Sequence, residues 1–83
     1  MQRLMGEREP AVKELDVRGL SCPLPVLKAR KALAGMARGT RLVVLATDPR
    51  APRDMAELCA ATGHRLLEGG EAQGVFRFVL ERG

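Results

Sequence analysis

The prolines at positions 23 and 25 constrain the fold of this 83-residue chain more than any other feature. A proline has no backbone N–H, and its ring clashes with the carbonyl four residues earlier, so a helix accepts it only in the first turn. The carbonyl that Pro25 would meet belongs to Ser21, which must therefore lie outside the helix. We predict a helix over residues 26–37 that stops at Gly39. Its buried face has apolar residues at a spacing of 3.6: Val26, Ala29, Leu33, Met36 and Ala37.

Two strand patterns and a second helix pattern accompany this helix. Residues 13–18 alternate apolar and polar side chains, which is typical of a half-buried strand. Residues 40–47 contain an aliphatic run, as expected for a strand well inside a sheet. A second helix is predicted over about residues 52–62, with Asp48 able to cap its start.

The C-terminal residues predict a hairpin. A short strand over 64–68 and a strand over 75–81 are joined by a glycine-rich turn over 69–74. The element order is then β-α-β-α-β-β. Because strand–helix–strand units are right-handed, both helices cover one face of the sheet if the strand order runs one way. The predicted fold class is α/β (α+β), a two-layer sandwich.

Size and composition set further limits. The chain can form one domain with one modest core, which we place at residues 13–83 after a loose tail at 1–12. The N-terminus has no apolar signal-peptide region, and the longest aliphatic run, Leu42 to Ala46, is too short to cross a bilayer. We therefore expect a cytoplasmic protein that does not associate with membranes. The net charge is +4, but Phe76 and Phe78 are the only aromatic residues, so direct nucleic acid binding by base stacking is not expected.

Cys22 stands directly ahead of the first predicted helix. The first N–H groups of a helix have no intrahelical partner, and the helix dipole favours negative charge there. Thiolate is the reactive form of cysteine, so Cys22 is the candidate catalytic nucleophile. The residues that follow it are predicted to position the sulfur or to stabilise its anion: Pro23, Leu24, Pro25 and Val26.

Full ionisation of this thiol requires help from cations, because the helix dipole contributes only roughly 0.3–1 kcal/mol at an exposed site. Arg18 is the nearest cation in the sequence. Arg50 and Arg53 are candidates if the second helix starts beside the first. Asp48 and Arg53 are expected to be structural, as a cap and an ion-pair member, and a place beside the sulfur stays open for both.

Other uses of the two cysteines are less well supported. Cys59 falls on the apolar face of the second helix, where cysteine behaves as a small hydrophobic residue. A thiol-redox protein that uses Cys22 and Cys59 stays open as an alternative, although a Cys-x-x-Cys motif is absent. His64, the only histidine, has no recognisable catalytic partner, and Cys22, Cys59 and His64 lack the spacing of metal ligands, so we predict no metal site.

A persulfide suits this arrangement. Its terminal sulfur is more acidic than a thiol, and a partner's nucleophile can attack it as in thiol–disulfide exchange. Such chemistry needs an accessible sulfur and a docking surface, but neither a deep pocket nor a catalytic base. A small basic regulatory or nucleic-acid-associated binding module is the alternative that the charge leaves open.

The chain resembles the TusA/SirA sulfur-carrier family over about residues 13–82. The family marker is Cys-Pro-x-Pro after Gly-Leu-x, found here within the stretch from Leu15 to Leu33. The resemblance implies a four-stranded mixed sheet of order 1-2-4-3, with the last strand antiparallel to the others and both helices on one face. A second group of matches lies further along: Thr47-Asp48-Pro49, Arg53-Asp54, Leu58-Cys59 and Gly63-His64.

The resemblance also implies a function. Cys22 would accept persulfide sulfur from a cysteine desulfurase or rhodanese-type donor and relay it to an acceptor protein. The pathways it implies are tRNA 2-thiolation, molybdenum-cofactor synthesis or sulfur oxidation. We expect a sulfurtransferase-like carrier without independent turnover, active as a monomer and without a cofactor.

Docking of partners is predicted for the basic residues near the thiol. The first helix has three of them about one turn from Cys22, and they are either a docking face for an acidic patch or a solvated helix surface. Two arginines before and within the second helix are further candidates. The set is Lys28, Arg30, Lys31, Arg50 and Arg53.

Overall fold

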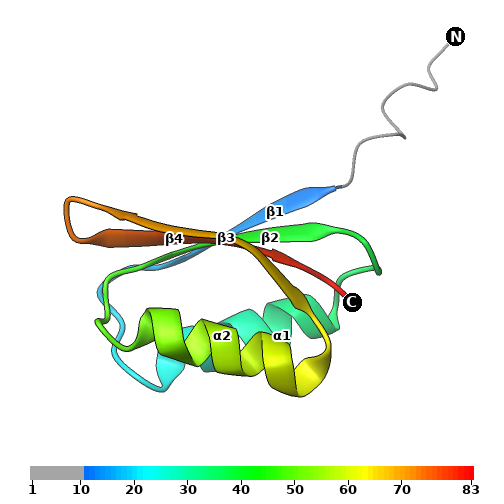
Figure 1. Ribbon diagram of the computed structural model, residues 1–83, viewed down its shortest axis with the longest axis horizontal. Helices are drawn as coiled ribbons and strands as arrows, with labels where there is room; N and C mark the ends of the chain where they lie inside the picture. Colours follow the sequence, from blue (N-terminus) through cyan, green and yellow to red (C-terminus); the bar gives the residue numbers. More distant parts are fainter. Residues whose placement is uncertain (1–10) are drawn as a thin grey trace, which may run out of the picture.

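The structure is a computed structural model and describes residues 11–83. Its four strands form one sheet, and two helices lie against one side of that sheet (Figure 1). The tail predicted for residues 1–12 falls almost entirely outside the described residues. The elements are β1 (Val12–Val17), α1 (Leu24–Ala34), β2 (Arg41–Ala46), α2 (Ala51–Thr62), β3 (Arg65–Ala72) and β4 (Val75–Glu81).

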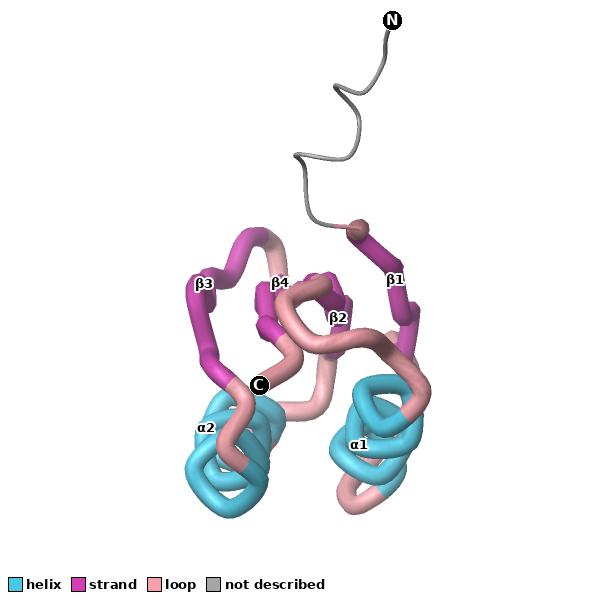
Figure 2. Tube along the Cα trace, turned by 90° about the vertical axis from the view of Figure 1, so that its right-hand side faces the viewer, coloured by secondary structure: helices cyan, strands magenta, loops and turns pink. Residues whose placement is uncertain are grey.

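The strands lie in the order β1-β2-β4-β3, which confirms the predicted sheet. β1 is parallel to β2, whereas β4 is antiparallel to both of its neighbours. α1 and α2 therefore each connect strands that run in the same direction. Figure 2 shows both helices side by side on the same face of the sheet, so the predicted two-layer β-α-β-α-β-β arrangement is confirmed.

The core fills the space between the sheet and the helices. Its largest fully buried side chains are those of Leu33, Leu42, Met55 and Leu80, which come from α1, β2, α2 and β4. Truncating a side chain of this kind to alanine typically costs about 2–5 kcal/mol of stability. The core therefore fixes both helices against the sheet. Neither helix within residues 11–83 has the length and apolar character that a membrane span requires.

α1 begins two residues earlier than the predicted helix over 26–37. Its first residue is Leu24, so Pro25 stands at the second helical position and Pro23 is the N-cap. The proline at position 25 does not keep Leu24 out of the helix, although a residue before proline usually avoids helical dihedrals. The first turn accepts both prolines because the N–H groups that they lack would have no intrahelical acceptor there.

α1 also ends earlier than predicted. Its last residue is Ala34, and Gly35 forms the C-cap. The N–H of Gly35 donates to the carbonyl of Ala32 at 3.2 Å, and the N–H of Met36 donates to that of Leu33 at 3.1 Å. The sequence pattern extends the helix to 37 because Met36 is apolar. Met36 does pack against the core, but it does so from the turn that follows the helix.

The hairpin is longer than predicted. β3 replaces the short strand over 64–68 and runs through most of the predicted turn over 69–74, which leaves Gln73-Gly74 as the turn. Gly69 in this edge strand is the register partner of Phe78 on β4. A Cβ added to Gly69 would lie 3.6 Å from the ring of Phe78, an ordinary van der Waals distance, so the ring packs against β3 at this position.

Candidate functional site

Cys22 lies at the edge of the sheet where β1 and β2 both end. The two strands are parallel, and Val17 at the end of β1 pairs with Ala46 at the end of β2. The loop after β1 contains Cys22 and leads to α1, and the loop after β2 leads to α2. Both loops lie at the left end of the molecule in Figure 1, so the two helices begin beside each other. The second helix thus starts beside the first, which is the arrangement that makes Arg50 and Arg53 candidate cations for the Cys22 thiolate.

Hydrogen bonds join these two loops. The Thr47 Oγ1 accepts the backbone N–H of Gly19 at 2.9 Å. The Asp48 Oδ2 accepts the backbone N–H of Cys22, and its Oδ1 accepts the N–H of Arg50 at 2.9 Å. Two consecutive side chains after β2 therefore hold the backbone of the loop that contains the thiol.

Asp48 was predicted to cap α2, and the structure gives it a different position. Arg50 is the N-cap of α2, and it makes no capping hydrogen bond through its side chain. Asp48 instead folds the turn before the helix, since its backbone carbonyl also accepts the N–H of Ala51 at 2.9 Å. Its contact with Cys22 spans 26 residues of sequence, so the sequence leaves a place beside the sulfur open for Asp48 but does not indicate this hydrogen bond.

The two cysteines have different environments. The side chain of Cys22 is partly exposed, whereas Cys59 is only 5% exposed, within the core beside Met55 and Leu58. Burial raises the pKa of the Cys59 thiol, which makes its thiolate rarer. Neither cysteine forms a disulfide. Cys22 is therefore the thiol that a partner can reach.

A disulfide between Cys22 and Cys59 does not fit this fold. Cys22 lies beside the start of α2 because Asp48 binds its N–H together with that of Arg50. Cys59 lies nine residues beyond Arg50, which is about 13 Å along the helix axis at 1.5 Å per residue. Bridged cysteines have Cα atoms less than about 7 Å apart. The thiol-redox alternative would thus require the fold to rearrange.

The N–H groups at the start of α1 are largely occupied. The Cys22 N–H donates to Asp48, and the Leu24 N–H donates to the Ser21 carbonyl at 2.9 Å. The carbonyl of Pro23, two residues further along, accepts the N–H of Leu27 at 3.1 Å. The Val26 N–H has no backbone acceptor within the described residues. Of the two donors expected near the sulfur, those of Leu24 and Val26, this leaves Val26 available.

Arg18, the predicted nearest cation, pairs with Asp16. Its Nε and Nη2 atoms donate to the two carboxylate oxygens at 2.9 and 2.7 Å, and its backbone N–H donates to the same side chain at 3.0 Å. These hydrogen bonds lower the pKa of Asp16 to about 2, and the side-chain bond to Asp16 is the main cause of a raised Arg18 pKa. Both side chains are half exposed. The guanidinium of Arg18 is therefore engaged with its own strand end.

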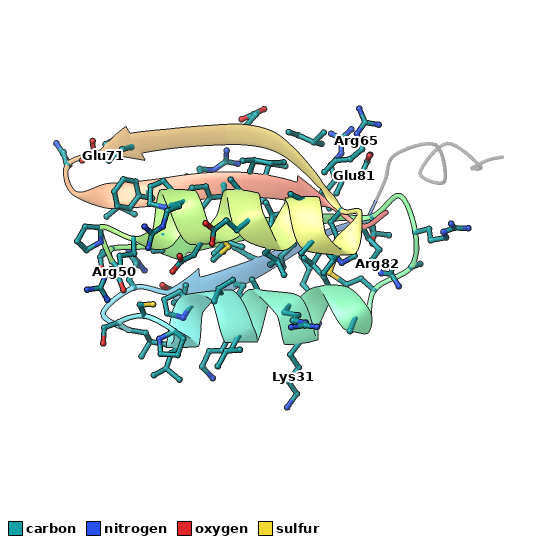
Figure 3. All side chains as sticks on the ribbon, turned by 60° about the horizontal axis from the view of Figure 1, so that its bottom comes forward. Lys31, Arg50, Arg65, Glu71, Glu81 and Arg82 are labelled. Atoms are coloured by element: carbon teal, nitrogen blue, oxygen red, sulfur yellow. The ribbon has the colours of Figure 1, made fainter. Side chains whose placement is uncertain are left out.

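The basic residues predicted for docking are exposed on two elements. Lys28, Arg30 and Lys31 are exposed on α1, and Figure 3 shows Lys31 projecting away from the body of the molecule. Arg50 lies at the end where the helices start (Figure 3), and Arg53 follows it in the first turn of α2. Arg53 is 70% exposed, and its Nε lies 3.9 Å from the Asp54 carboxylate.

Two exposed leucines complete this face of α1, of which sequence reasoning assigned Leu24 to the thiol site and gave Leu27 no role. Leu24 is 45% exposed and Leu27 is 51% exposed. Leu27 and Arg30 also line a groove between α1 and α2. The signal was present in the helical period, because these leucines fall off the buried stripe formed by Ala29 and Leu33.

His64 has no part in the site. Its Nδ1 accepts the backbone N–H of Gly83 at 3.0 Å, and it follows the C-terminal end of α2. A helix of 12 residues is about 18 Å long, so His64 lies well away from Cys22 at the other end. Within residues 11–83, no cluster of three or more potential ligands could hold a metal ion. Among the described residues, the geometry offers a partly exposed thiol without an adjacent histidine.

Comparison with known proteins agrees with this geometry. Residues 13–82 match the family described as sulfurtransferase TusA. A protein of Neisseria meningitidis serogroup A named for a sulfur-carrier role is 55% identical over 67 residues, which cover 81% of this chain and 90% of that protein. Sulfur carrier protein TusA of Allochromatium vinosum is 43% identical over 70 residues, which cover 84% of this chain and 92% of that protein.

A solved structure shares the fold. The crystal structure of a SirA-like protein from Desulfitobacterium hafniense superposes with a TM-score of 0.76 and 26% sequence identity, covering 87% of this chain and 97% of that one. Fold and site thus define a small sulfur-carrier protein with a single accessible cysteine. The chain belongs to the TusA sulfurtransferase family, which confirms the family resemblance and the sulfur-carrier function at that level. As such a carrier, it passes sulfur to partner proteins.

Proposed function

We propose that Cys22 is the atom that carries the sulfur, and that the protein receives this sulfur from a donor persulfide and delivers it to an acceptor protein. The observation that supports this most directly is the contrast between the two thiols. Cys22 is partly exposed on a loop anchored by Thr47 and Asp48, whereas Cys59 is buried. A carrier needs one sulfur that a second protein can approach and that the fold holds in place.

The chemistry balances without an oxidant or reductant. The Cys22 thiolate attacks the outer sulfur of a donor persulfide, and a new S–S bond forms as the S–S bond within the donor breaks. The donor leaves as a thiolate, and Cys22 becomes the persulfide. Delivery repeats the exchange, with an acceptor nucleophile attacking the outer sulfur and Cys22 leaving as thiolate.

The partners we propose are a cysteine desulfurase or a rhodanese-type protein as donor and a sulfur-relay protein as acceptor, in the cytoplasm. The face of α1 next to the thiol supports this, because its exposed leucines and basic residues match a partner with an apolar contact surrounded by acidic residues. The acceptor decides whether the sulfur reaches tRNA thiolation, molybdenum-cofactor synthesis or sulfur oxidation. We propose that the carrier acts as a monomer without a cofactor and does not bind nucleic acid itself.

Intact-mass analysis tests the proposal. Incubation with a cysteine desulfurase and cysteine, without reductant, should add sulfur to the wild-type protein. Cys22→Ser should acquire none, and Cys59→Ser, the matched control, should load like the wild type. Sulfur retained on Cys22→Ser, or lost from Cys59→Ser alone, would refute the assignment.

A further inference from the structure

Asp48 is the one polar or charged residue that is buried among residues 11–83, with 9% of its surface exposed. A buried carboxylate costs free energy unless hydrogen bonds satisfy it. Here each oxygen accepts one backbone N–H, from Cys22 and from Arg50. Both donors come from the segments that lead into helices. A single carboxylate therefore binds the start of α1 and the start of α2 at once.

Capping alone does not account for this arrangement. The bond from Oδ1 to the Arg50 N–H organises the turn before α2, and it uses only one of the two carboxylate oxygens. The bond from Oδ2 reaches a different loop, 26 residues away, at the backbone of the cysteine itself. The neighbouring Thr47 binds the same loop at Gly19, three residues before the cysteine. The β2–α2 loop thus holds the cysteine loop at two points.

We propose that Asp48 is the positioning residue of the sulfur-carrying site, an inference that rests on the proposed function. By accepting the Cys22 N–H, it fixes the backbone from which the sulfur projects. Its negative charge is buried against the backbone of Cys22, so a thiolate or persulfide anion, which it repels, is directed away from it. The sulfur then projects outward, where a donor or acceptor approaches.

The first test compares loading with simple alkylation. In Asp48→Ala we expect sulfur loading by a cysteine desulfurase and cysteine to slow about 10- to 100-fold, because a misplaced reacting atom costs on that order. Alkylation of Cys22 by iodoacetamide should not slow, since a small reagent needs no defined approach. Asp48→Asn keeps one carbonyl oxygen and should load at an intermediate rate.

Gly63→Ala is the matched control for loss of helix stability. Gly63 is the C-cap of α2 with a φ of 82°, so an alanine there weakens the same helix from the end remote from Cys22. This variant should load sulfur at the wild-type rate. Wild-type loading by Asp48→Ala, equal slowing in Gly63→Ala, or an equal slowing of alkylation would each overturn the positioning role.

An NMR measurement covers the case in which Asp48→Ala does not fold. The amide proton of Cys22 in the wild-type protein should resonate downfield, as expected for a bond to a carboxylate, and should move upfield in Asp48→Asn. An unchanged Cys22 resonance in that variant would refute the contact. If the wild-type protein instead acquires no sulfur, the proposed function fails, while the amide resonance still reports on Asp48.

Discussion

Val17 and Ala46 are register partners on parallel strands, and this pairing brings Cys22 and Asp48 to the same edge of the sheet. Parallel strands direct their following loops to one edge, where α/β proteins commonly place their sites. The site therefore depends on the strand register as much as on the cysteine motif.

Labelling with iodoacetamide should separate the two thiols. Cys22 is partly exposed, whereas Cys59 is buried and has a raised pKa, so its thiolate is both rarer and protected. We expect the native protein to acquire one label, on Cys22, and the denatured protein to acquire a label on each cysteine. Peptide mass analysis assigns the sites. Rapid native labelling of Cys59 would contradict the burial described above.

Acidic pH should weaken the contribution of Asp48 to stability. The N–H groups of Arg50 and then Cys22 hold the pKa of Asp48 below its usual value. Because the folded pKa lies below the unfolded pKa of about 3.9, the stabilisation is fully present above about pH 4. It is lost as the pH falls through the folded pKa.

Urea unfolding of the wild-type protein and of Asp48→Ala measures this contribution. The difference in unfolding free energy between them should be constant above about pH 4 and shrink below it. A difference that persists unchanged in strong acid would show that the carboxylate charge is not involved.

Sequence reasoning found the architecture and the nucleophile but not the contacts of the nucleophile. The alternation of strand and helix patterns and the two prolines are local signals, and they were enough for the order of the elements. The Asp48 contact with Cys22 depends on strand pairing, which a single sequence does not encode locally. Gly69 was assigned to a turn because glycine is common in turns, whereas it lies in β3 against Phe78.

Charge reversal on α1 should impair docking. The triple variant Lys28→Glu, Arg30→Glu and Lys31→Glu should slow sulfur loading by a cysteine desulfurase about 10-fold at low salt, because steering between opposite charges accelerates association. The difference in loading rate between the triple variant and the wild type should become smaller as salt is added, because salt screens the charges. Arg38→Glu is the control, because Arg38 is exposed in the connection between α1 and β2, beyond the end of α1 that is remote from Cys22. Equal slowing by Arg38→Glu would assign the effect to net charge instead of this face.

Stability should depend on Leu33 and not on Leu27. Leu33 is fully buried in the core, so Leu33→Ala should lower the unfolding free energy by about 2–5 kcal/mol. Leu27 is 51% exposed on the same helix, so Leu27→Ala should change the unfolding free energy by less than about 0.5 kcal/mol. Urea denaturation checks both. A large loss in Leu27→Ala would mean that this side chain belongs to the core and is not available to a partner.

The turn between β3 and β4 offers a stabilising substitution. Gln73 has a φ of 53° and Gly74 a φ of 81°, so both turn residues are in the left-handed region that two-residue hairpins require. Glutamine adopts this region at a cost, whereas asparagine adopts it readily. Gln73→Asn should therefore raise the unfolding free energy by roughly 0.5 kcal/mol, and Gly74→Ala should lower it by roughly 1 kcal/mol. Thermal unfolding should show opposite shifts in the unfolding temperature of the two variants. Among residues 11–83, no hydrogen bond joins this turn to the loop that contains Cys22. Both variants should therefore load sulfur like the wild type.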